Sequence, residues 1–296
     1  MSDKKTETEQ EQKTENAQSE PQQESKPEQK NDENPAPNPE QENKVVNSEI
    51  IGKKVFFLNP SVNMQNQIMA ELSQHEYEVY TVKNTAHLTR VLKKYPDSIV
   101  YINLDETQKS ETEKWLDSTA SAMPDVLVGI FSSSVDEDLK NKYLHKPNVK
   151  CGFINIKFDM TKTTPQIIKV FESMAVKGRR KYLRATTENE ETATINMPNE
   201  SGEYVNGTIK DISVVGFSCL FETDPGLKKN NLFKNIQIRL HTMLLKAEAV
   251  VFGSRNENGK SVYVLLFTNR IDPEVCVKIR KYIQQNLQRK MEQFYK

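Results

Sequence analysis

The stretch GRRKYLRA at residues 178–185 marks the place where the pattern of this chain changes. Before it, apolar runs alternate with amphipathic segments of helical period. After it, short apolar runs are separated by polar turns. The stretch itself places three arginines and a lysine within six positions, from Arg179 to Arg184. A basic run of this kind is usually solvated surface, so a binding function needs a second signal elsewhere in the chain.

Upstream of this stretch, five apolar runs are each followed by a segment with helical spacing. SIVYINL at 98–104 is apolar almost throughout, which is typical of a strand buried on both faces of a parallel sheet. In the last helical segment, Thr164 is the expected N-cap, Pro165 stands in the first turn and Gly178 follows the end. We therefore expect a flavodoxin-like α/β domain with a five-stranded parallel sheet between helices. The expected strands are 53–59, 78–82, 98–104, 126–132 and 151–156, and the expected helices are 64–77, 86–96, 111–123, 136–145 and 164–178.

Downstream, the pattern predicts short strands separated by polar turns such as PNESG at 198–202 and NENGK at 256–260. Strands at this spacing are typical of a closed antiparallel barrel. The chain ends in an amphipathic helix, 273–295, whose apolar residues step by four and are too few for a stable coiled coil, so we expect it to pack on its own barrel. The expected strands are 185–197, 203–212, 215–222, 234–241, 244–254 and 261–267.

The N-terminal segment differs from the rest in composition. Residues 1–44 contain no Val, Ile, Leu, Phe, Tyr or Trp and carry twelve acidic and six basic side chains. Such a segment cannot bury enough apolar surface to offset its chain entropy. We therefore divide the chain into a disordered acidic tail, 1–48, an α/β domain, 49–177, and a barrel with its C-terminal helix, 178–296.

Composition also argues against several classes of function. The three cysteines are far apart and form no CxxC pattern, which argues against a zinc site or a disulfide framework. No signal peptide and no apolar run of about 20 residues is visible, so we expect a cytoplasmic protein without a membrane span. No catalytic motif is found, and we expect neither an enzyme, a metal nor a cofactor.

The α/β pattern over residues 53–177 resembles the receiver domain of two-component systems. That resemblance implies an acidic pair after the first strand, a phosphate-accepting Asp after the third, a Ser or Thr after the fourth and a Lys after the fifth. The acidic residues would hold Mg²⁺ through their oxygens. The hydroxyl and the lysine would contact the phosphoryl oxygens.

This chain departs from that pattern. Asn59 stands where the acidic pair belongs, and the best alignment puts Asn103 at the acceptor position. Ser132 and Lys157 fit the two later positions, while Asp105 lies two residues late. Because an amide cannot be phosphorylated, we expect a receiver-like domain that is not phosphorylated. Phosphorylation of Asp105 in spite of the shift is the alternative.

A second signal accompanies the basic run. Arg180-x-x-x-Arg184 is followed about 27 residues later by Asp211-x-Ser213-x-x-Gly216 at the start of an apolar run. The two motifs, in this order and in a strand-rich context, resemble the PilZ domain family, whose members bind the bacterial second messenger cyclic di-GMP. The resemblance implies that these five residues contact the ligand.

The chemistry of the residues fits such a ligand. Arginine pairs bidentately with phosphate or with guanine O6 and N7, and its plane stacks on purines. Asp211 can accept from guanine N1–H and N2–H₂, Ser213 can contact phosphate or base, and Gly216 would let the backbone approach the ligand. Arg179, just before the motif, favours a stacked pair of ligand molecules by the same resemblance.

We therefore expect a receptor that turns cyclic di-GMP binding into an interdomain change or a change in binding an unidentified protein partner. One alternative is a ligand-independent PilZ module in motility or secretion machinery. Another is a nucleic-acid-binding protein. The chain carries 41 basic and 41 acidic residues, and the 35 basic and 29 acidic residues beyond position 44 are too evenly matched to favour nucleic acid. For the oligomeric state, a monomer is favoured.

Overall fold

The computed structural model describes residues 51–156, 160–187, 192–268 and 271–295. The tail expected to be disordered, 1–48, lies outside the described residues, as does Lys157. Within the described residues, no helix is long and apolar enough to cross a membrane.

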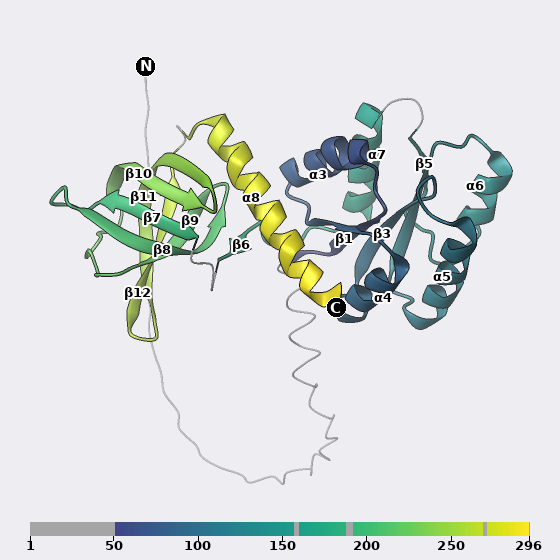
Figure 1. The fold of residues 1–296 in the computed structure, drawn as a ribbon, viewed down its shortest axis with the longest axis horizontal. Helices are drawn as coiled ribbons and strands as arrows, with labels where there is room; N and C mark the ends of the chain where they lie inside the picture. The colour runs from purple at the N-terminus through teal and green to yellow at the C-terminus, as the bar shows by residue number, and fades with distance from the viewer. Residues whose placement is uncertain (1–50, 157–159, 188–191, 269–270, 296) are drawn as a thin grey trace, which may run out of the picture. The chain divides into compact units, whose positions relative to one another are not determined.

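The first half of the described chain builds a five-stranded parallel sheet in the order β2-β1-β3-β4-β5 (Figure 1). The central strand β3 is buried at every residue, because helices cover both faces of the sheet. The prediction of a five-stranded parallel sheet is confirmed. The strands are β1 (Lys54–Leu58), β2 (Val79–Val82), β3 (Ser98–Asn103), β4 (Leu127–Ser132) and β5 (Phe153–Asn155).

Alternating strand residues supply two separate apolar cores. On β3, Val100 packs with α4 and α5 on one face, whereas Tyr101 packs with the first helix and α7 on the other. The first helix is continuous, with one π-helical segment between two α-helical ones. The helical segments are α2 (Val62–Met64), η1 (Gln65–Met69), α3 (Ala70–Gln74), α4 (Thr85–Lys94), α5 (Lys109–Ala122), α6 (Glu137–Leu144) and α7 (Met160–Ser173).

The expected bounds of the last of these helices were wrong. Helix α7 begins at Met160, so Thr164 is buried inside the helix and Pro165 lies beyond its first turn. It ends five residues before Gly178, with Ala175 in the left-handed region at φ 49°. The backbone N–H of Val176 donates to the carbonyl of Phe171 at 3.0 Å, as in a Schellman cap. Burial of these two apolar side chains fixes this end without the glycine that the prediction relied on.

The second half of the described chain forms an antiparallel barrel, as expected. The strands follow the order β6-β8-β7-β10-β11-β12-β9, and the additional pairing of β8 with β9 closes the barrel through six of them. The run expected as one strand over 185–197 contains two strands, β6 and β7. The strands are β6 (Ala185–Thr186), β7 (Ala193–Pro198), β8 (Tyr204–Ser213), β9 (Gly216–Phe221), β10 (Leu232–Leu240), β11 (Met243–Glu257) and β12 (Lys260–Phe267).

The C-terminal helix α8 (Pro273–Glu292) packs on the barrel, as expected, and also on the sheet. Ile279 and Ile283 belong to the barrel core, whereas Met291 belongs to the core formed by α4, α5 and the sheet. These contacts lie within one compact unit, residues 39–296. The side-chain amide of Gln288 accepts from the backbone N–H of Thr81 at 2.9 Å and donates to its carbonyl at 3.0 Å. It thereby satisfies backbone groups of the edge strand β2. A short 3₁₀ segment, Gln293–Tyr295, follows the helix.

Candidate functional site

The basic loop, residues 179–184, connects the end of α7 to β6 and contains no helix or strand. Its two apolar residues, Tyr182 and Leu183, are half-buried and pack against the barrel core. Arg180 and Arg184, on either side of this pair, are exposed, as is Arg179. The apolar pair therefore anchors the middle of the loop while the guanidinium groups lie at the surface.

Strand pairing brings the loop beside the second motif. Immediately after Arg184, β6 pairs antiparallel with β8, with Thr186 opposite Asp211. The Nη1 of Arg184 lies 3.7 Å from the Oδ1 of Asp211. A β-bulge between Ile209 and Asp211 interrupts the ladder of β8 and β9 at this point, and bulges commonly re-aim a neighbouring side chain. Two motifs far apart in the sequence thus lie side by side in the fold.

The ion pair in this site is a weak one. The side chain of Arg184 is 47% exposed and that of Asp211 is 22% exposed, so solvent screens their attraction. Asp211 also accepts a hydrogen bond from the hydroxyl of Ser218 on β9, which holds its carboxylate in place. An incoming phosphate or guanine can therefore compete for Arg184 at small cost.

The remaining two motif residues serve the turn between β8 and β9. The hydroxyl of Ser213 is buried, donates to the carbonyl of Gly216 at 3.1 Å and accepts from the N–H of Val215 at 3.4 Å. A Cβ at Gly216 would fall 2.2 Å from the carbonyl oxygen of Leu265 on β12. The close approach of β12 thus accounts for the glycine, and the ligand contacts expected for Ser213 and Gly216 stay predictions.

A cavity of about 220 Å³ lies beside Arg180 and Arg184. At its wall, Lys54 and Tyr80 both bond to the carboxylate of Glu78, which is buried. Burial and the neighbouring Glu78 raise the pKa of Tyr80 well above its ordinary value, so the phenol stays protonated. This cluster is internally paired, and the other cations of the wall are Arg180, Arg184 and Lys290, whose ammonium group donates to the hydroxyl of Thr186 at 2.7 Å. The other lining residues are Ile51, Tyr95, Tyr182, Leu183, Leu287, Met291 and Phe294.

The edge of the sheet at which the receiver resemblance expects a phosphate differs from the basic loop, because its polar side chains bond to the chain itself. The amide of Asn103 donates to the carbonyl of Asn59 at 3.1 Å. The carboxylate of Asp105 accepts from the hydroxyl of Ser132 at 3.0 Å and from the N–H of Ser133 at 2.7 Å. The hydroxyl that the resemblance assigns to phosphate therefore binds a carboxylate of the chain itself. Across the described ranges, no group of three or more His, Cys, Asp or Glu side chains is placed to hold a metal ion.

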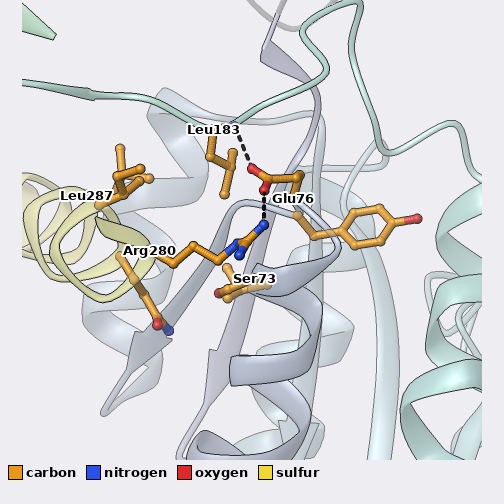
Figure 2. Close-up of a pocket in the computed structure, with 9 residues that line it drawn as sticks. Ser73, Glu76, Leu183, Arg280 and Leu287 are labelled. Carbon is orange, nitrogen blue, oxygen red and sulfur yellow. Dashed lines mark hydrogen bonds and ion pairs between the residues drawn. The ribbon is translucent and has the colours of Figure 1, made fainter. Parts of the chain in front are cut away.

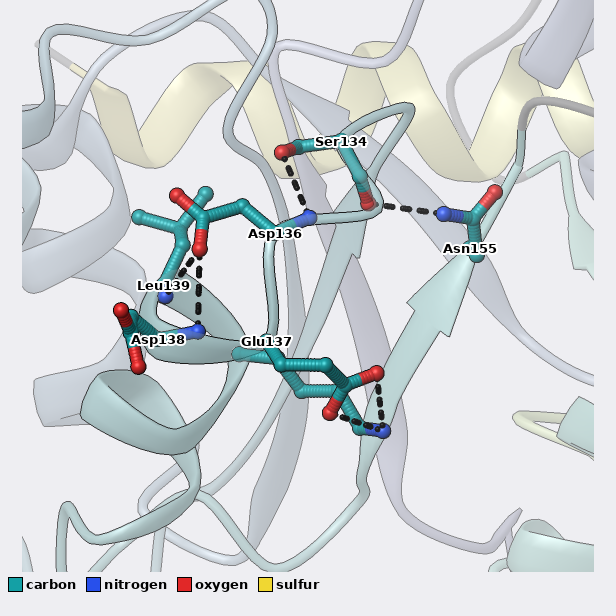
Figure 3. A network of polar contacts seen from close by, with 7 residues as sticks. Ser134, Asp136, Glu137, Asp138, Leu139 and Asn155 are labelled. Carbon is teal, nitrogen blue, oxygen red and sulfur yellow. Dashed lines mark hydrogen bonds and ion pairs between the residues drawn. The ribbon is translucent and has the colours of Figure 1, made fainter.

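The loop that follows β4 is tied down by a further network (Figure 3). Asp136 caps α6 by accepting from the N–H groups of Asp138 at 2.9 Å and Leu139 at 3.2 Å. Its own N–H donates to the hydroxyl of Ser134, whose carbonyl accepts from Asn155 on β5 at 2.7 Å. The polar groups at this edge thus bond to one another.

Two residues near the basic loop were missed by the sequence analysis. Glu76, just after α3, and Arg280 of α8 bond to each other, and Glu76 also bonds to the backbone of the loop. Helical spacing predicts a helix up to residue 77 and gives Glu76 no distinct role. The alternation of polar and apolar residues carries no signal for a contact made across so many intervening positions.

No protein-family model matches the chain, and no curated protein matches it. Solved structures do match parts of the chain. The barrel part resembles the PilZ domain with c-di-GMP of YcgR from Escherichia coli, at 16% identity and a TM-score of 0.34, over 39% of this chain and 95% of that one. The inhibitor of motility MotI/DgrA of Bacillus subtilis matches at 19% identity and a TM-score of 0.31, over 36% of this chain and only 50% of that one.

The sheet part resembles a response regulator from Thermotoga maritima, at 18% identity and a TM-score of 0.36, over 41% of this chain and 99% of that one. Likenesses to both expected families, PilZ and receiver, are thus found among solved structures. At such low identities and TM-scores they leave the ligand chemistry to be argued from the residues of this chain.

Proposed function

We propose that this chain is a cyclic di-GMP receptor and not an enzyme. The observation that carries the proposal is the pairing of β6 with β8, which sets Arg184 of the basic loop beside Asp211 of the second motif. A cationic fork and a carboxylate next to each other complement a guanine nucleotide, which offers phosphate oxygens to the first and N–H donors to the second.

Each arginine of the basic loop has a role in this proposal. Arg184 leaves its weak pair with Asp211 and binds a phosphate or the O6/N7 edge of guanine, while Asp211 accepts from the N–H groups of the base. Arg180 binds from the cavity that both arginines line. Arg179 stacks on a second guanine, which gives a stoichiometry of two ligand molecules per chain.

Ligand binding would neutralise the three arginines of the loop and order their exposed side chains against β8. The loop joins α7 of the sheet domain to β6 of the barrel, so a change in its order can alter the surface that a protein partner binds. A receptor for a bacterial second messenger of this kind acts in the cytoplasm.

The test is isothermal titration calorimetry of the full chain with cyclic di-GMP. The wild type should give saturable heat, and R180A/R184A should lose affinity by at least about a hundredfold, because each charge-assisted contact contributes about 1.5–3 kcal/mol. K181A removes one positive charge from the same loop, so it is the matched control and should bind as the wild type does. Equal heats from the wild type and the double variant would end the proposal. No heat from the wild type would favour a ligand-independent interaction module.

A further inference from the structure

Glu76 adopts a backbone conformation that favours glycine. It follows α3 with φ 61°, and the neighbouring N–H of Tyr77 donates to the carbonyl of Leu72 at 3.0 Å, which closes a Schellman cap. Glycine is the common residue at this position because a Cβ is strained there. Glycine would remove the strain at this position, but it could not make the side-chain contacts that Glu76 makes.

The side chain of Glu76 joins three elements of the chain (Figure 2). Its Oε2 accepts from the backbone N–H of Leu183 at 2.9 Å, and its Oε1 lies 3.2 Å from the Nη2 of Arg280 on α8. The Glu76 side chain is only 12% exposed, so both contacts are shielded from solvent. One carboxylate thus connects the end of α3, the basic loop and α8.

The position of Leu183 gives this contact its consequence. Leu183 lies between the two arginines of the Arg180-x-x-x-Arg184 motif, and its side chain already packs against the barrel core. With its N–H held by Glu76, the residue is fixed through both backbone and side chain. Fixing the middle of a loop reduces the conformational entropy that its ends lose on binding a ligand.

The space beside this contact is too small to be a ligand site. The cavity lined by Ser73, Glu76, Leu183 and Arg280 has a volume of about 10 Å³, which admits one water molecule at most. The contact therefore acts on the ligand site through the loop and not by touching a ligand.

We propose that Glu76 is a positioning residue for the cyclic di-GMP site, through which the receiver-like domain sets the affinity of the barrel for its ligand. This inference rests on the proposed function for its ligand. The contact between Glu76 and the backbone of the basic loop can be observed without any ligand. Glu76 pre-orders the basic loop, and Arg280 holds the Glu76 carboxylate in place.

The test compares E76G with the wild type in two measurements on the full chain. Glycine suits the left-handed backbone at this position, so E76G should fold, because the relief of backbone strain offsets part of the stability lost with the two Glu76 contacts. Without ligand, the Leu183 amide of E76G should exchange its hydrogen faster, because its acceptor is gone. In calorimetry, E76G should bind cyclic di-GMP about tenfold more weakly, because binding must then also order about one residue of the loop that Glu76 holds in the wild type.

Two further variants separate positioning from a structural role. A175G relieves the same kind of backbone strain at the end of α7, and should change neither the exchange of Leu183 nor the affinity. E76Q keeps an acceptor for Leu183 but loses the ion pair with Arg280, and should bind between the wild type and E76G.

The outcomes are distinguishable. If the Leu183 amide of E76G exchanges faster but the affinity is unchanged, the positioning role is overturned. If the exchange of this amide is unchanged, Glu76 does not hold the loop. If the wild type itself gives no heat with cyclic di-GMP, the proposed function fails, whereas the exchange comparison still decides whether Glu76 holds the loop.

Discussion

Two regions of this chain resemble phosphate-binding sites of known families, and their side chains are in opposite states. At the edge of the sheet, Asp105 is bonded by Ser132 and Ser133, so the polar groups satisfy one another. At the basic loop, Arg180 and Arg184 are exposed, and the second makes only a weak ion pair. A resemblance can point to a candidate site, whereas the bonding of the polar groups there decides whether a ligand can bind them.

Replacing Arg184 by lysine should have the largest effect on this comparison. R184K keeps the charge but loses the bidentate fork, and we expect it to weaken cyclic di-GMP binding by about 1.5 kcal/mol in calorimetry, the low end of the range for a complete contact. K181R in the same loop is the matched control and should leave the affinity unchanged. Wild-type affinity in R184K would mean that the loop supplies charge alone, as a merely solvated basic patch would.

Adding a methyl group at Gly216 separates the structural from the binding part of the second motif. The new Cβ would meet the carbonyl of Leu265, so we expect G216A to lower the free energy of unfolding by about 1–3 kcal/mol. G253A on β11 is the control, because a Cβ there meets nothing within 4 Å. Chemical denaturation measures both. If G216A keeps wild-type stability but no longer binds cyclic di-GMP, then Gly216 has the ligand-binding role that the resemblance implies.

Removing the carboxylate of Asp105 should have the smallest effect. D105A loses two hydrogen bonds at an exposed site, so we expect about 1 kcal/mol less stability and an unchanged affinity for cyclic di-GMP. D125A, an exposed aspartate elsewhere in the same domain, is the control. In parallel, acetyl phosphate with Mg²⁺ should leave no acid-labile phosphate on Asp105, and finding one by mass spectrometry would reopen the receiver edge as a site.

The sequence predicted the layers of this fold well because each strand and helix repeats a period that burial imposes. It predicted helix ends poorly. Both Ala175 and Glu76 end helices in the left-handed region without being glycine, since buried neighbours and side-chain contacts fix them. The double contact of α8 was likewise missed, because its spacing by four shows that a face is buried but not against which core.

For the candidate site, the sequence predicts which residues contact a ligand, but it does not show how these residues are bonded in the fold. The order of the two motifs predicted that the basic loop meets β8, and the pairing of Thr186 with Asp211 places them together. The sequence could not separate Asp211, which faces Arg184, from Ser213, whose hydroxyl closes a turn. A ligand-binding role and a structural role fit the same sequence, and only the hydrogen bonds in the fold distinguish them.

The most direct test of the central claim is a calorimetric titration of the full wild-type chain with cyclic di-GMP and, separately, with cyclic di-AMP. The two ligands share their phosphates, but only guanine offers N1–H and N2–H₂ to Asp211 and O6 to an arginine. We expect saturable heat with two molecules of cyclic di-GMP per chain and much weaker binding of cyclic di-AMP. Equal binding of both ligands, or of neither, would contradict it.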